Sequence, residues 1–117
     1  DLDWFLAAST YSTLCCKKRE PLFQYPIQVF RIGGLAVVSM AGEPFTDGQL
    51  DIKLRSKAAL TYVTHCVNKY AGYLPHDKGY DFDGHGSNSK YTFWAKFKRG
   101  SLEKVCDGIV DGIERLF

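Results

Sequence analysis

Two short runs of apolar residues, separated by a pair of glycines, stand out in the first half of the sequence. Residues 27–32 read Ile-Gln-Val-Phe-Arg-Ile, and residues 35–40 read Leu-Ala-Val-Val-Ser-Met, with Gly33 and Gly34 between them. β-rich runs on either side of a two-residue glycine turn are typical of a hairpin. We therefore expect antiparallel strands over 27–32 and 35–40.

The period of the pattern changes after residue 43. Thr46 and Gln49 match a capping box, and Phe45 and Leu50 occupy the positions of a hydrophobic staple. A helix is therefore predicted to begin near Asp47. Its apolar positions on one side would be Leu50, Leu54 and Ala58.

A third β-rich run, 60–67, follows this helix. Strand, helix and strand in succession most simply form a parallel pair joined by a right-handed crossover. The carboxyl ends of two parallel strands lie on the same rim of the sheet, where ligand sites of open α/β sheets are found. The turn that holds Glu43 and the turn after Val67 should therefore meet on that rim.

Helical spacing appears again at both ends of the chain. The first segment has an apolar face and ends in a basic cluster before Pro21, and the last one is expected to start at a Ser101 cap. The first face comprises Trp4, Ala8, Tyr11 and Cys15; the second comprises Leu102, Val105, Ile109, Ile113 and Leu116.

Residues 75–90 are rich in Gly, Asp, Asn and Ser and predict a long loop, either functional or a surface excursion. Residues 91–97 would be a strand or the end of that loop. The predicted fold class is α/β, a small mixed sheet (a hairpin plus one parallel crossover) with helices packed on it. The 117 residues would form a single domain or the C-terminal part of a larger α/β catalytic domain.

Composition narrows the possible partners. The formal net charge is only +2, and the basic clusters at 17–19 and 96–99 are interpreted as solvated helix ends and loops, so we expect no nucleic-acid partner. No apolar run is long enough to cross a bilayer. The four cysteines contain no C-x-x-C pair, which leaves the compartment open. Because the sequence begins at Asp1, we expect a processed chain or a piece of a longer one.

The sequence does not match several familiar metal-binding, nucleotide-binding and catalytic motifs. Aligning Asp81, Asp83 and Gly84 with a calcium loop puts Gly79 at the first ligand position and Lys90 where a glutamate belongs. The sequence also lacks a complete dinucleotide fingerprint, a G-x-S-x-G elbow and an H-E-x-x-H helix. These residues therefore contain no complete catalytic constellation.

Glu43 lies between Gly42 and Pro44, which restrict the backbone on both sides of it. The stretch that ends in Ala-Gly-Glu-Pro-Phe, followed by a helix, a β run and Asn-Lys-Tyr-Ala-Gly-Tyr, resembles the C-terminal part of the catalytic domain of neutral, non-lysosomal ceramidases. That family has Pro-Gly-Glu and Asn-x-Tyr-x-x-Tyr at these places. Here Ala41 replaces the proline.

The resemblance implies a zinc-dependent amide hydrolase that acts on an N-acyl sphingoid or related lipid amide. Its single zinc ion would be held by Glu43, by Tyr73 and by two histidines from outside this segment, supplied by the rest of the parent polypeptide or by a companion chain. Carboxylate and histidine donors suit zinc, which can activate a water molecule near neutral pH. Asn68 and Tyr70 would shape the turn or the substrate pocket. The family also suggests a secreted, periplasmic or membrane-surface location.

Other interpretations of these residues remain open. His65 would be a core or sheet-face residue, whereas His76 and His85, in the loop, could be solvated or could bind a metal in a small independent metalloprotein. Glu43 could instead favour the start of the following helix, and the tyrosines could simply pack. A different class of function is a non-catalytic α/β binding or interaction module that retains the family scaffold.

Overall fold

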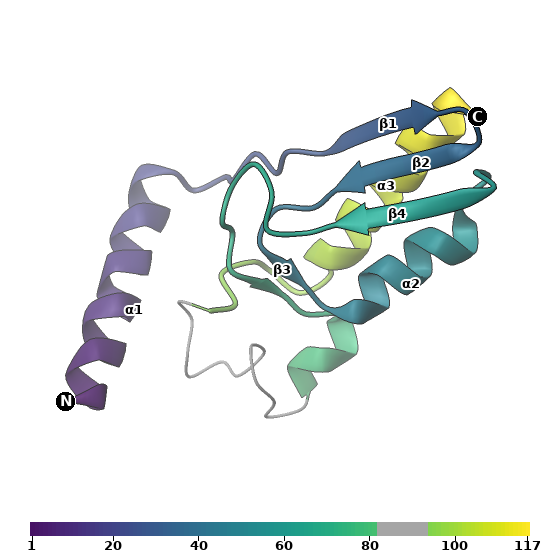
Figure 1. The fold of residues 1–117 in the computed structure, drawn as a ribbon. Helices are drawn as coiled ribbons and strands as arrows, with labels where there is room; N and C mark the ends of the chain where they lie inside the picture. Colours follow the sequence, from purple (N-terminus) through teal and green to yellow (C-terminus); the bar gives the residue numbers. More distant parts are fainter. Residues whose placement is uncertain (82–93) are drawn as a thin grey trace.

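The computed structural model describes residues 1–81 and 94–117. The described chain measures 51 × 29 × 21 Å along its principal axes. Its elements are, in order, α1 (Leu2–Arg19), β1 (Gln28–Ile32), β2 (Leu35–Ser39), β3 (Glu43–Pro44), α2 (Thr46–Arg55), β4 (Leu60–Thr64), β5 (Tyr73–Leu74), the 3-10 helix η1 (Asp77–Asp81) and α3 (Ser101–Leu116). Figure 1 shows α2 and α3 against the sheet, with α1 to one side.

The main sheet has the order β1-β2-β4. β1 and β2 form the antiparallel hairpin predicted from the glycine pair, with Gly33 at φ +58° in the turn. β2 and β4 pair in parallel, with Leu35 opposite Leu60 and Ser39 opposite Thr64, so α2 is the predicted crossover. The predicted fold class, a small mixed α/β sheet with packed helices, is confirmed. β4 ends at Thr64, three residues before the end of the strand predicted over 60–67.

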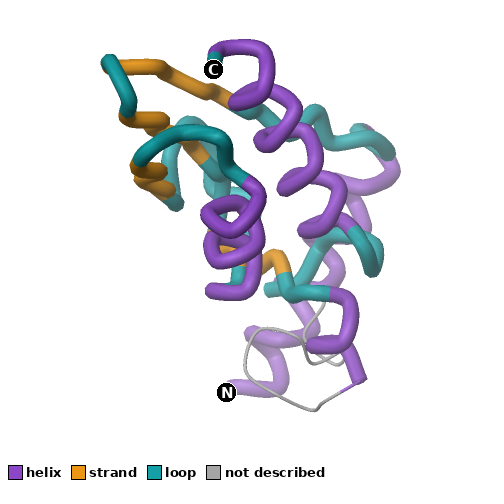
Figure 2. The backbone as a smooth tube through the Cα atoms, turned by 90° about the vertical axis from the view of Figure 1, so that its right-hand side faces the viewer, coloured by secondary structure: helices purple, strands orange, loops and turns teal. Residues whose placement is uncertain are grey.

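Both packed helices lie on one side of the main sheet, as the view along the strands shows (Figure 2). Alternate residues of the strands point toward them, and Ala36 and Val38 of β2 are fully buried. The stripe predicted for the last helix is confirmed apart from Leu116, which is 40% exposed. The side chains that α3 buries are Leu102, Val105, Cys106, Ile109, Val110 and Ile113.

Two details of the helix starts were predicted wrongly. The N-cap of α2 is Phe45, which makes no side-chain capping bond, so the capping box does not form. The residue that caps α3 is Gly100, at φ +77°, and not Ser101. Glycine adopts this left-handed conformation without a steric penalty, so the chain turns into α3 without a side-chain cap.

The apolar face predicted for α2 is also wrong. The helix buries Gly48 and Ile52, while Leu50 and Leu54 are 58% and 86% exposed. Close packing on α3 selects the other face: a Cβ at Gly48 would lie only 2.8 Å from Leu102 Cδ1. A small residue at this point therefore decides which side of α2 faces the core.

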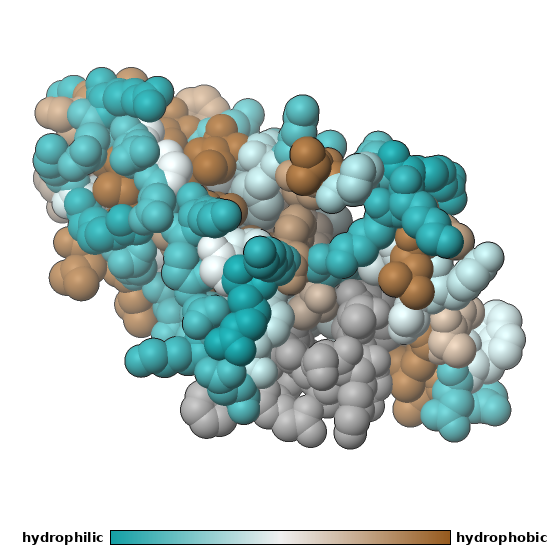
Figure 3. Space-filling model, turned by 180° about the vertical axis from the view of Figure 1, so that it is seen from behind, coloured by the Kyte–Doolittle hydropathy of each residue, from teal (hydrophilic) through white to brown (hydrophobic). Residues whose placement is uncertain are grey.

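The N-terminal helix forms as predicted, but its expected apolar face is not buried. No residue of α1 is buried, and both Trp4 and Tyr11 are 71% exposed. The view from behind shows hydrophobic side chains along this helix at the right (Figure 3). Within residues 1–81 and 94–117, no helix combines the length and apolar character needed to cross a membrane.

The loop predicted over 75–90 lies only partly within the described residues. Its first part contains η1, which Arg99 holds through Nε to Asp77 at 3.0 Å and Nη1 to Asp81 at 2.7 Å. Arg99 is thus bound in ion pairs rather than simply solvated. Of the two possibilities for 91–97, a strand or the end of the loop, residues 94–97 favour the second because they form no strand; residues 91–93 lie outside the described residues.

Candidate metal centre

Glu43 and Tyr73 lie side by side in a small second sheet. β3 and β5 pair in parallel, and the register places Glu43 opposite Tyr73 and Pro44 opposite Leu74. The backbone N–H of Glu43 donates to the carbonyl of Gly72 at 2.8 Å. Paired residues of adjacent strands point to the same face, so the carboxylate and the phenol lie on one side of this sheet. The two turns meet as the parallel crossover predicted.

Two glycines permit this close approach. Gly42 and Gly72 have φ +70° and φ +76°, in the left-handed region that favours glycine. A Cβ at Gly42 would lie 2.4 Å from the carbonyl oxygen of Gly72, and one at Gly72 would lie 2.6 Å from that of Trp94. These contacts are with backbone atoms that cannot swing aside. The spacing of Glu43 and Tyr73 therefore depends on both glycines.

The turn after β4 is also held against Glu43. The Cys66 N–H donates to the carbonyl of Gly42 at 2.8 Å, and the Gly42 N–H donates to that of Lys69 at 3.1 Å. Cys66 and Asn68 both have positive φ, at 56° and 66°. Asparagine tolerates this conformation, but for cysteine it is uncommon. The backbone hydrogen bonds therefore fix an unfavourable turn next to the candidate site.

Asn68 stabilises this turn and does not line the cleft next to Glu43. Its Nδ2 donates to Gln28 Oε1 at 2.8 Å and to Ser39 Oγ at 3.3 Å. Two residues before Glu43, the carbonyl of Ala41 accepts a hydrogen bond from the Tyr25 hydroxyl at 2.6 Å. Burial raises the pKa of this phenol. The turn after β4 is thus attached to β1 and β2, and the residues before Glu43 are attached to the segment before β1.

Tyr70 contacts the candidate ligand directly. Its hydroxyl donates to Glu43 Oε1 at 2.7 Å, and this hydrogen bond, more than burial, raises the pKa of Tyr70 to about 12. Burial, followed by hydrogen bonding with Glu43, also raises the pKa of Tyr73. Both phenols therefore hold their protons in the protein alone. A cation bound to Glu43 and Tyr73 would reverse this preference, because its charge favours the phenolate.

A cleft of about 450 Å³ opens beside Glu43 and Tyr73. His65 lines it, although the sequence suggested a core or sheet-face residue in a strand. β4 ends one residue before His65, which is exposed. A histidine directly after a buried strand, at the carboxyl end of a parallel pair, is the signal that could have placed it on the rim. The cleft is also lined by Pro44, Phe45, Thr46, Asp47, Gln49 and Val63.

His76, the first of the two loop histidines, does not add to this cleft. The ring of His76 lies 6.1 Å from that of Phe45, and its Nε2 is 3.8 Å from Asp47 Oδ2. It is not among the residues that line the cleft. His85 lies outside the described residues.

The donor set suits zinc only in part. A carboxylate, a phenol and an imidazole border one cleft, and zinc prefers nitrogen and oxygen donors of this kind. Within 1–81 and 94–117, however, no three His, Cys, Asp or Glu side chains are grouped to hold a metal ion. A complete centre would thus need donors from elsewhere. Searches of protein-family models, curated proteins and solved structures found no match to this chain.

Proposed function

We propose that this chain is the C-terminal segment of a ceramidase-like, zinc-dependent amide hydrolase. Its substrate would be an N-acyl sphingoid or a related lipid amide. Glu43 and Tyr73 would contribute two ligands to a zinc ion whose other ligands come from the rest of the parent polypeptide or from a companion chain. The observation that carries the proposal is the register of β3 and β5, which pairs the two predicted ligands residue to residue.

The chain's own residues would have distinct tasks at this centre. Zinc, when bound, would polarise the amide carbonyl and supply an activated water. Tyr70 would orient the Glu43 carboxylate through its 2.7 Å hydrogen bond, as outer partners of metal ligands commonly do. Gly42 and Gly72 would fix the backbone geometry in advance, which lowers the entropic cost of arranging the ligands.

The proposal is tested by measuring zinc content and amide hydrolysis of the full native product. We expect one zinc ion per chain and hydrolysis of an N-acyl sphingoid. Glu43→Gln should lower zinc affinity by more than about 100-fold, because removal of a direct ligand exceeds the effect of an outer partner. Glu114→Gln is the matched control, since Glu114 lies on the surface of α3 and pairs with Lys57 at 3.0 Å.

Retained zinc and retained hydrolysis in Glu43→Gln would contradict the role of Glu43. The alternative function is a non-catalytic binding or interaction module that keeps the same scaffold. The incomplete donor set in the described part of the chain is compatible with this alternative as well as with the hydrolase. A native product without zinc and without hydrolysis would support it.

A further inference from the structure

In the part of the chain that the structure describes, β4 is an edge strand without the protection that charged residues or proline give. Among the described residues it pairs only with β2. Its sequence, Leu-Thr-Tyr-Val-Thr, contains neither a charged residue nor proline, the two devices that commonly prevent an edge from pairing. The other edge strand, β1, differs: Arg31 donates to the Leu116 carbonyl, and its guanidinium lies 4.6 Å from the centre of the Phe117 ring.

α2, the helix next to β4, also exposes apolar side chains on this side of the molecule. α2 turns Gly48 and Ile52 toward α3 and the core. Leu50 and Leu54 follow these two residues by two positions, which is about 200° around a helix. They therefore face away from α3, and they are 58% and 86% exposed.

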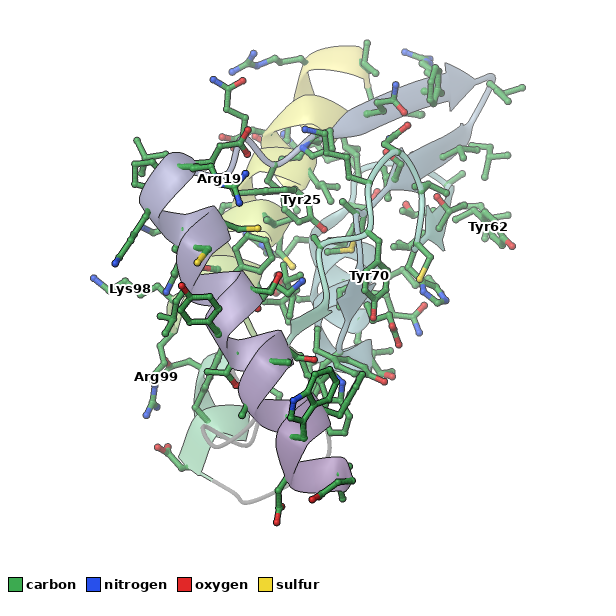
Figure 4. The ribbon with its side chains drawn as sticks, turned by 90° about the vertical axis from the view of Figure 1, so that its left-hand side faces the viewer. Arg19, Tyr25, Tyr62, Tyr70, Lys98 and Arg99 are labelled. Carbon is green, nitrogen blue, oxygen red and sulfur yellow. The ribbon has the colours of Figure 1, made fainter. Side chains whose placement is uncertain are left out.

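Two of the side chains of β4 that point away from the helices are largely apolar as well. Leu60 is 65% exposed and Tyr62 is 62% exposed. Figure 4 shows Tyr62 pointing outward on the far side of the sheet from α3. We call the free edge of β4 together with Leu50, Leu54, Leu60 and Tyr62 the β4-side surface. Parallel strands are normally buried on both faces, so an exposed surface of this kind is unusual for them.

The candidate metal cleft adjoins this surface. Val63 and His65, at the carboxyl end of β4, line the cleft together with Gln49 of α2. A strand added beside β4 would therefore run past the opening, and one of its ends would reach the neighbourhood of Glu43. Among residues 1–81 and 94–117, the surface without a packing neighbour therefore lies next to the cleft whose donor set is incomplete.

We propose that a further strand of a longer polypeptide pairs with the free edge of β4, and that the helix connected to it packs on Leu50 and Leu54. The end of the added strand would carry a metal donor to the cleft. This part of the inference, which concerns the missing zinc ligands, rests on the proposed function. Sheet and helix layers would then both continue past β4 and α2.

A second copy of the chain fits this surface less well. Two copies related by a two-fold axis would pair their β4 strands antiparallel. Each cleft would then face the start of the partner's strand, where the residue is Leu60, which offers no metal donor. A lipid surface fits poorly too, because hydrocarbon cannot satisfy the unpaired backbone groups of an edge strand.

Backbone hydrogen exchange compares the full native product with the isolated 117-residue chain. We expect the amides of β4 to exchange at least about tenfold more slowly in the longer protein, because an added strand binds the edge. The amides of β1 are the internal control and should exchange equally in both. Equal exchange of β4 in the two proteins overturns the proposal, as does a native product that consists of these residues alone.

A second variant tests the helix contact in the same full native product. Leu54→Lys should lower its thermal midpoint, whereas Leu2→Lys, at an exposed position on α1, should not. Equal tolerance of both substitutions overturns the helix contact. Hydrogen exchange needs no metal, so a protected β4 in a protein without zinc upholds this packing and removes only the proposed function.

Discussion

The two long helices of this chain differ in what holds them. α3 has 16 residues and buries six of them, while α1 has 18 residues and buries none. In α3 the apolar residues form one stripe, but in α1 they are spread around the helix. α1 has local support at its ends: Asp1 accepts a hydrogen bond from the Asp3 N–H at 3.0 Å, and basic residues occupy the last turn. Helical sequence signals therefore predict the element without predicting its packing.

The largest expected effect comes from removing a buried side chain of α3. Ile109 is fully buried, so Ile109→Ala should destabilise the chain by about 2–5 kcal/mol through lost burial and a cavity. Leu14→Ala, on α1, removes a side chain that is 52% exposed and should change the stability by less than about 0.5 kcal/mol. Urea unfolding measures both. Similar losses would mean that α1 packs as tightly as α3.

A smaller loss of stability is expected at the turn before Glu43, which close contacts hold in place, as they do α3. Gly42→Ala places a Cβ 2.4 Å from the Gly72 carbonyl oxygen and requires an L-residue at φ +70°. We expect a loss of about 1–3 kcal/mol, measured by urea unfolding. Gly33→Ala, at φ +58° with nothing within 4 Å, is the matched control for backbone strain without a clash. Equal losses would show that the close contact at Gly42 contributes nothing.

The smallest intervention is chemical labelling of one thiol in each helix. Burial is the main cause that raises the pKa of Cys106, in α3, to about 12. Cys16, in α1, is exposed. Alkylation requires the thiolate, so raising the pH from about 7 to about 9 should accelerate labelling at Cys16 and leave Cys106 unreacted. Mass spectrometry of the labelled peptides measures this. Equal labelling in the folded chain would place Cys106 outside the core.

The sequence was most informative where a pattern repeats. The hairpin followed from the paired glycines, and the parallel crossover followed from strand, helix and strand. The β3–β5 pair was not predicted, because two-residue strands are too short to show any periodicity. The meeting of Glu43 with the turn after β4 could be predicted from the crossover alone.

Other errors came from contacts between distant parts of the chain. Leu50 and Leu54 looked like a core face, but Gly48 allows the opposite side of α2 to approach α3. His65 was assigned to a strand because the apolar run continues past it, although pairing with β2 ends at Thr64. In both cases the deciding partner lies far away in the sequence.

The central claim is that Glu43 and Tyr73 share one cation, and a double-mutant cycle of zinc affinity in the full native product tests it most directly. Glu43→Gln, Tyr73→Phe and the double variant would be titrated with zinc, with Tyr11→Phe as the control on exposed α1. Ligands of one ion are coupled, so we predict that the double variant departs from the sum of the single losses by more than about 0.5 kcal/mol. Additive losses, or no loss from either single variant, would contradict the claim.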